Sequence, residues 1–70
     1  MKLFELLLVM DDNEYITINY HNFPYERMTV EEFKDYCEIN NLTQVIFLRR
    51  VEHVWRSTVT PSIVIRLNAE

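Results

Sequence analysis

Hydrophobic residues recur along the first part of the chain at the spacing of a helix and then at the spacing of a strand. Residues 2–10 place Leu3, Leu6, Leu7 and Met10 three and four positions apart, which predicts a short helix with one buried face. Because this apolar run is short, a buried strand is the alternative interpretation. Residues 11–14 are all polar and predict a turn, since Asp and Asn side chains bond to nearby backbone amides.

Residues 15–20 change to a period of two, with Ile16, Ile18 and Tyr20 on the same side of the backbone. This alternation predicts a half-buried strand. Residues 21–28 are expected to connect it to the next element, because Pro24 fixes its own backbone angle and favours an extended residue before it.

A capping box predicts where the next helix begins. The Thr29 hydroxyl can accept a hydrogen bond from an amide of the first turn, and the Glu32 carboxylate can reach back to the Thr29 amide. The helix is expected to run from residue 30 to about residue 40 and to end at the two asparagines 40–41, since Asn tolerates the left-handed conformation of a helix end. Its predicted inner face comprises Val30, Phe33 and Cys37, with Tyr36 beside them.

The last third of the chain is rich in β-branched and aromatic residues. Residues 43–55 predict a long strand with a bulge or bend at Arg49 and Arg50, where two charged residues interrupt the alternation. Residues 56–61 predict a turn that ends at Pro61. Residues 62–67 alternate again and predict the last strand.

The order helix, strand, helix, strand, strand predicts a single compact α+β domain over residues 1–70. A right-handed crossover through the second helix would make the first two strands parallel. The last strand can then insert between them, antiparallel to both. We therefore expect a sheet of about three strands, mostly antiparallel, with one or two helices packed on one face.

Composition narrows the classes of function. The chain has 70 residues and no glycine, and phosphate loops, dinucleotide fingerprints and nucleophile elbows all need glycine. The single cysteine, Cys37, cannot form an internal disulfide, which favours a reducing cytoplasm. The longest apolar run, residues 6–10, is far shorter than a membrane span of about 20 residues, and no signal peptide is evident. A core this small favours support from a partner or from a homodimer.

The net charge of −4 is unevenly distributed. Residues 1–44 carry a formal charge of −6, whereas residues 45–69 carry +3. Two surfaces of opposite potential would steer the protein toward a charged partner.

The predicted helix 30–40 carries the densest acidic pattern. Glu31, Asp35 and Glu38 recur at four and three positions and Glu32 lies beside them, so these carboxylates are expected on the solvent face. Successive charges then lie roughly 5–6 Å apart, which is close to the spacing of phosphates along one strand of nucleic acid. This stripe could bind the basic channel of a nucleic-acid-binding protein as a charge mimic.

A second candidate surface is basic and aromatic. Arg49, Arg50 and Arg56 surround Trp55 in the sequence, and an aromatic ring beside arginines can stack on a base while the cations hold phosphate. The acidic isoelectric point near 5.0 argues against direct nucleic-acid binding. If the strand that carries these residues lies at a sheet edge, it could instead pair with another chain, in a homodimer or with a partner protein.

Neither catalysis nor a cofactor is expected. The hydroxyls of residues 57–62 and the two histidines, His21 and His53, show no spacing that would assemble a nucleophile, a base and oxyanion donors. His21, Cys37 and His53, together with Glu38, could supply four zinc ligands. Their spacing differs from zinc-ribbon patterns and Cys37 falls on the predicted inner face of its helix, so we expect no metal and keep zinc as the alternative.

The segment LFELLLVMDDNEYITI, residues 3–18, combines a short helix, an acidic turn and a strand. In this segment and in its small, acidic character the chain resembles small cytoplasmic proteins encoded by bacteriophages and prophages of Gram-positive hosts. That group includes anti-CRISPR proteins, which typically block a CRISPR effector by binding it, often with acidic surfaces over its nucleic-acid-binding regions.

The resemblance implies a phage-type inhibitor without enzymatic activity, which binds and blocks a nucleic-acid-handling complex in the bacterial host cytosol. A CRISPR effector nuclease is the expected partner, and the resemblance assigns no site residue. We expect Glu31, Glu32, Asp35 and Glu38, or else the arginine-bearing hairpin with Arg49, Arg50, Trp55 and Arg56, to form the interface. The alternative is a self-associating structural or accessory phage module that uses its sheet edge.

Overall fold

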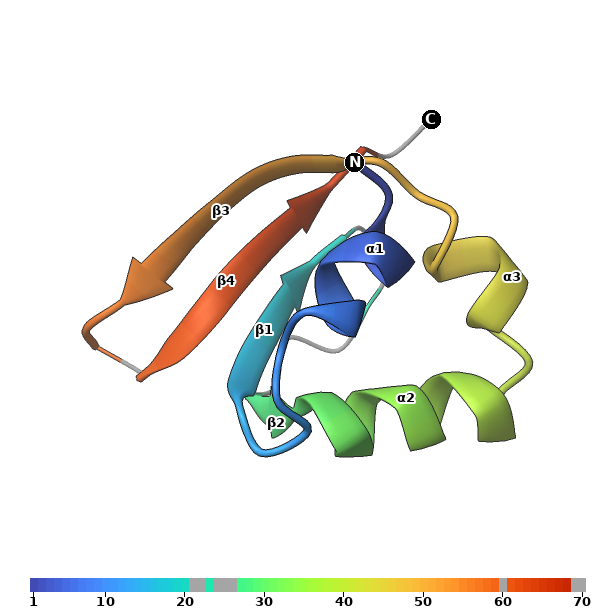
Figure 1. The fold of residues 1–70 in the computed structure, drawn as a ribbon, viewed down its shortest axis with the longest axis horizontal. Coiled ribbons are helices and arrows are strands. Elements are labelled where there is room, and N and C mark those ends of the chain that lie inside the picture. Colours follow the sequence, from blue (N-terminus) through green and yellow to red (C-terminus); the bar gives the residue numbers. More distant parts are fainter. Residues whose placement is uncertain (21–22, 24–26, 60, 69–70) are drawn as a thin grey trace.

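The elements of the chain are seen in a computed structural model, which describes residues 1–20, 23, 27–59 and 61–68. In chain order they are α1 (Leu3–Leu8), β1 (Tyr15–Asn19), β2 (Met28–Thr29), α2 (Val30–Ile39), α3 (Thr43–Ile46), β3 (Val51–Ser57) and β4 (Ser62–Leu67). The helices lie on one side of a four-stranded sheet (Figure 1). This arrangement confirms the predicted α+β class, with one more strand and one more helix than expected.

The sheet has the strand order β2-β1-β4-β3, so β4 lies between β1 and β3 as predicted. The predicted antiparallel pairing of β4 with β3 is confirmed, whereas the predicted antiparallel pairing of β4 with β1 is wrong, because these two strands run parallel. The short strand β2 adds an antiparallel edge beside β1. The sheet is therefore mixed, and β1 and β3 run in opposite directions.

The reason for the difference lies between α2 and β3. The crossover rule assumes that a helix returns the chain directly to the next strand of the sheet. Here α3 and residues 47–50 redirect the chain before β3 begins, and β3 and β4 then form a hairpin that brings β4 back beside β1 (Figure 1).

One hydrophobic core joins the helices to the sheet. The parallel register places Ile16 beside Ile63 and Ile18 beside Ile65, so these side chains share the face toward the helices. The buried cluster consists of Leu3, Leu7, Ile16, Ile18, Phe23, Val30, Phe33, Cys37, Ile46, Ile65 and Leu67. It includes residues from each inner face that the sequence pattern predicts.

The segment 2–10 is helical, so the alternative of a buried strand is wrong. Leu3 and Leu7 are buried in α1, and Leu6 and Met10 pack partly buried against the core. Helix α1 ends at Leu8, two residues earlier than expected.

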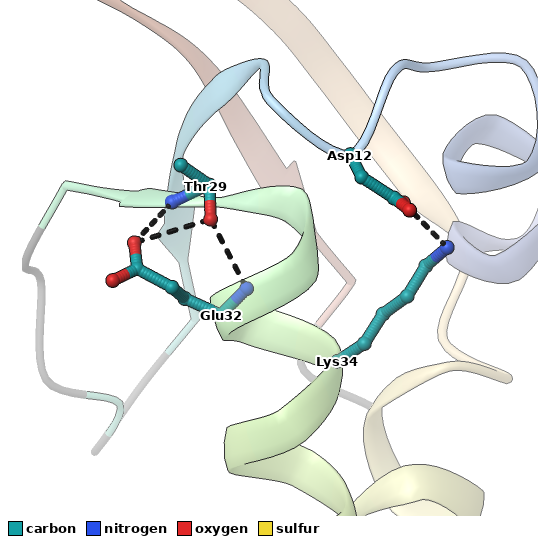
Figure 2. Close-up of polar contacts among 4 residues, drawn as sticks. All are labelled: Asp12, Thr29, Glu32 and Lys34. Atoms are coloured by element: carbon teal, nitrogen blue, oxygen red, sulfur yellow. Dashed lines mark hydrogen bonds and ion pairs between the residues drawn. The ribbon is translucent and has the colours of Figure 1, made fainter.

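Helix α2 begins and ends as its sequence predicts. The Thr29 Oγ1 accepts a hydrogen bond from Glu32 N at 3.1 Å, and the Glu32 Oε1 accepts one from Thr29 N at 2.9 Å (Figure 2). At the other end Asn41 has φ 58°, and Leu42 N donates to Cys37 O at 2.8 Å. This bonding pattern closes a helix end in the left-handed conformation, with Asn in the place that Gly usually takes.

The predicted strand over residues 43–55 is wrong in its first part, because residues 43–46 form α3. Ile46 is buried in the core, and the Phe47 ring stacks on Phe33 with 5.8 Å between ring centroids. Packing of these apolar side chains against α2 therefore overrides the strand preference of the local sequence.

The predicted bulge or bend at Arg49 and Arg50 is confirmed as a bend, because the backbone bends at Arg49 before β3 begins. The register of β3 with β4 also shifts between Val51 and His53, an irregularity that the sequence did not predict. Arg56, which was predicted to begin the turn, still lies within β3.

Candidate functional site

Helix α2 presents opposite faces to the core and to solvent. Val30, Phe33 and Cys37 are buried. The four predicted carboxylates are exposed on the other side, and we call them the acidic face: Glu31, Glu32, Asp35 and Glu38. The structure therefore brings these residues together on one rigid element.

Glu32 has a structural role as well as a charge. Its Oε1 accepts hydrogen bonds from both the amide and the hydroxyl of Thr29, at 2.9 and 3.1 Å (Figure 2). Part of its hydrogen-bonding capacity is thus used to fix the first turn of α2.

The cation that lies nearest in the sequence does not neutralise the acidic face. Lys34 Nζ forms an ion pair with Asp12 Oδ1 at 3.4 Å and so ties α2 to the turn before β1 (Figure 2). Within the described part of the chain, Glu31, Asp35 and Glu38 have no ion-pair partner. Their negative charges are available to a partner.

Glu38 stands where a carboxylate is unfavourable. It lies near the carboxyl end of α2, and the last turn of that helix contains no basic residue. The helix dipole disfavours a negative charge there by about 0.3–1 kcal/mol. Asp35, three positions earlier, adds like-charge repulsion of about 0.2–0.5 kcal/mol. Glu31 at the other end of α2 has the opposite, favourable relation to the dipole.

The basic and aromatic candidates do not form one surface. Arg49 and Arg50 precede β3 and line a hollow near α3. Further along β3, Trp55 pairs with Val64 and Arg56 pairs with Ile63, so their side chains point to opposite faces of the sheet. The structure thus divides these four residues among three places.

Trp55 lies on the sheet face away from the helices. The Arg66 guanidinium lies 5.7 Å from the Trp55 ring centroid, and the His53 ring centroid lies 5.1 Å from it. Sequence reasoning missed Arg66, because its approach to Trp55 depends on the register between β3 and β4.

Arg56 lines a hollow of about 380 Å³ with side chains of both charges, including Asp11, Glu14 and Arg27. Arg27 is held in place, since its Nε donates to Pro61 O at 2.8 Å and its guanidinium lies 3.6 Å above the Tyr15 ring. The mixed charge of this hollow favours neither an anion nor a cation.

Among the described residues, the alternative zinc ligands Cys37, Glu38 and His53 are not brought together. Cys37 is fully buried, and burial raises the pKa of its thiol to about 11, whereas a metal ligand must be a thiolate. His53 is exposed on β3, and His21 lies outside the described residues. Among the described residues no three His, Cys, Asp or Glu side chains gather in a way that could hold a metal ion.

Ser62 is a hydroxyl residue of the β3–β4 region that lies within the sheet. Ser62 is 3% exposed, and its Oγ lies 2.8 Å from Thr17 Oγ1, so it has a structural partner. Thr60 lies outside the described residues.

Lys2 is a candidate residue that sequence reasoning missed. It forms an antiparallel bridge with Arg50 and lines the same hollow as Arg49 and Arg50. No signal in the sequence could have placed it there, because the two segments are far apart in the chain.

None of the helices in the described residues has the length and apolar character needed to cross a membrane. Comparison of the chain with protein-family models, with curated proteins and with solved structures gave no match.

Proposed function

We propose that the protein is a non-enzymatic inhibitor that binds a nucleic-acid-handling complex of a bacterial host through the acidic face of α2. The observation that carries this proposal is the exposed carboxylate set Glu31, Asp35 and Glu38, which has no ion-pair partner within the described residues. Glu38 in particular lowers the stability of its helix. A local feature that costs stability without a structural gain is typical of a functional surface.

The proposed mechanism is occlusion of a basic nucleic-acid channel. The carboxylates repeat at roughly 5–6 Å along the helix axis and can approach lysines and arginines that normally contact phosphates. Because the capping box and the core already fix α2, little conformational entropy is lost when this face binds. A CRISPR effector nuclease is the proposed partner.

The test is a double charge reversal, Asp35→Lys with Glu38→Lys. The protein is produced in a Gram-positive host with an active CRISPR system, and the plating efficiency of a targeted phage is measured. The unaltered protein should restore plating, whereas the double variant should lose this effect while keeping its thermal unfolding transition.

The matched control is Asp11→Lys with Glu52→Lys, which changes the net charge equally at exposed positions outside α2. This control should keep inhibition. Equal loss in both variants would show that net charge and not the acidic face matters. Affinity capture from the lysate of the same host, read by mass spectrometry, should recover the effector with its guide RNA.

A second candidate function is self-association as a structural or accessory module. It is favoured by the position of β3, which forms an edge of the sheet and carries Val54 at 42% exposure. An exposed edge strand can pair with a second copy. Sedimentation velocity over a wide concentration range tests this candidate, and a monomer at every concentration would contradict it.

A further inference from the structure

A basic hollow is lined by residues from the start of the chain, from α3 and from the segment between α3 and β3. Figure 1 shows the start of the chain close to the segment that leads into β3. Its volume is about 580 Å³, within the range of small-molecule sites. Three of its lining residues are cations, Lys2, Arg49 and Arg50, and two are exposed apolar residues, Val45 and Leu48. No carboxylate is among the described residues that line it.

Backbone hydrogen bonds hold together the two chain segments that carry the three cations. Leu3 N donates to Arg49 O at 2.9 Å, and Asn68 N donates to Arg50 O at 2.9 Å. On the same segment, Val51 N donates to Met1 O at 2.8 Å. The backbone that carries the cations is thus held in place before any ligand arrives, so that binding orders side chains and no backbone.

The pairing of Lys2 with Arg50 is unfavourable by itself. The two residues are direct partners in an antiparallel bridge, so their side chains leave the backbone on the same side. Like charges in this position repel each other. Within the described part of the chain, no ion pair offsets the charge of Lys2, Arg49 or Arg50. The Arg49 guanidinium lies 5.6 Å from the centroid of the Tyr20 ring, which carries no charge to neutralise it.

We propose that this hollow binds a phosphate group. Three positive charges exceed what one carboxylate can neutralise, whereas a phosphate monoester carries about −1.5 to −2 at neutral pH. Arginine also presents paired N–H donors that match two phosphate oxygens. The phosphate belongs either to a small phosphorylated compound or to a strand of nucleic acid. The site is independent of the acidic face of α2.

The first experiment is an NMR titration of the ¹⁵N-labelled full chain with sodium pyrophosphate at constant ionic strength. The amides of residues 2 and 48–50 should shift together and saturate. Arg50→Gln should weaken this binding by about tenfold or more, since it removes charge-assisted hydrogen bonds. Arg56→Gln is the matched control, because it removes the same charge from another hollow, and it should bind pyrophosphate as the unaltered chain does.

A second titration with oligothymidylate distinguishes the two sources of phosphate. Binding of the oligonucleotide that is tighter than that of pyrophosphate and is lost in Arg50→Gln assigns the site to nucleic acid. Saturable binding of pyrophosphate alone assigns it to a small phosphorylated compound. Shifts that do not saturate, or an equal loss in Arg50→Gln and Arg56→Gln, would overturn the proposal.

Thermal unfolding shows whether the variant is folded and gives an independent readout. Arg50→Gln removes the repulsion between the positive charges of Arg50 and its bridge partner Lys2, so the unfolding temperature of the variant without ligand should not fall. Pyrophosphate should raise the unfolding temperature of the unaltered chain and should raise that of Arg50→Gln less at the same concentration, because ligand binding to the native state stabilises it. An equal rise in both proteins would contradict a site at Arg50.

Discussion

Glu38 lowers the stability of α2 and is also part of the proposed interface. One substitution at this position should therefore change stability and inhibition in opposite directions. Glu38→Gln removes the negative charge from the carboxyl end of α2 and its repulsion with Asp35. We expect the free energy of unfolding to rise by about 0.5 kcal/mol, measured by urea denaturation with circular dichroism. The same variant should be a weaker inhibitor.

Glu31→Gln is the control for this substitution. Glu31 lies in the first turn of α2, where a carboxylate interacts favourably with the helix dipole. This variant should therefore show no gain in stability. An equal gain from both substitutions would mean that overall charge, and not position along the helix, sets the effect.

Cys37 predicts a pH dependence of stability in the alkaline range. Burial raises the pKa of its thiol from 9.0 to about 11. The unfolded chain therefore releases this proton at lower pH than the native protein, so the thiol lowers the stability as the pH rises from 9.0 to about 11. Below that window it contributes no pH dependence.

The measurement is urea denaturation of the unaltered chain and of Cys37→Ala across this window. The unaltered chain should lose stability more steeply with pH than Cys37→Ala does. Equal slopes would contradict a raised thiol pKa. At neutral pH the native thiol should also resist a thiol-specific reagent that reacts readily once the chain is unfolded in urea.

At the level of elements, the capping box of α2 is a local device whose loss has a defined cost. Thr29→Ala removes the acceptor for Glu32 N and the hydroxyl that donates to Glu32 Oε1. The free energy of unfolding should fall by about 1 kcal/mol, measured by thermal or urea denaturation. Thr29→Ser keeps the hydroxyl and should retain most of the stability. A similar loss in both variants would point to the lost methyl group instead.

The elements that could be predicted from the sequence carry their own start and stop signals. Helix α2 has Thr29 and Glu32 at its start and Asn41 at its end, and β1 has a strict alternation around Ile16 and Ile18. Helix α3 could not be predicted, because no side chain caps its start and its residues favour a strand. Its conformation depends on packing of Ile46 against the core, which local sequence does not reveal.

The candidate sites also differ in whether local sequence or the tertiary fold brings their residues together. The acidic face was predictable because its residues lie on one helix at helical spacing. The basic hollow was predictable only in part, since Arg49 and Arg50 are adjacent in sequence but Lys2 joins them through a bridge between distant segments. The separation of Trp55 from Arg56 follows from the strand alternation once β3 is known to include both.

For the whole molecule, the separation of acidic and basic surfaces predicts how salt affects stability. The net charge is −4, and the described residues contain one ion pair, between Lys34 and Asp12. Repulsion on the acidic face and in the basic hollow is then screened by added salt. Moderate concentrations of sodium chloride should raise the unfolding temperature, as followed by circular dichroism. A fall would show that attractive charge pairs dominate.

The charge-reversed variant Asp35→Lys with Glu38→Lys is the control for this salt effect. It places cations beside Glu31 and at the carboxyl end of α2, where they are favourable. Its unfolding temperature should respond less to sodium chloride than that of the unaltered chain. A smaller salt response in this variant would show that repulsion on the acidic face causes the salt dependence of the unfolding temperature.

The parallel pairing of β1 with β4 also determines when the protein can fold during its synthesis. Residues 16–19 pair with residues 63–66, so the two central strands of the sheet come from segments far apart in the chain. Contacts of this kind close large loops and slow folding. A ribosome that has released α1, β1 and α2 has therefore released no completed sheet. The core that covers the apolar side chains of α1 is incomplete until β4 supplies Ile65 and Leu67, and a nascent chain halted before residue 62 should remain sensitive to protease.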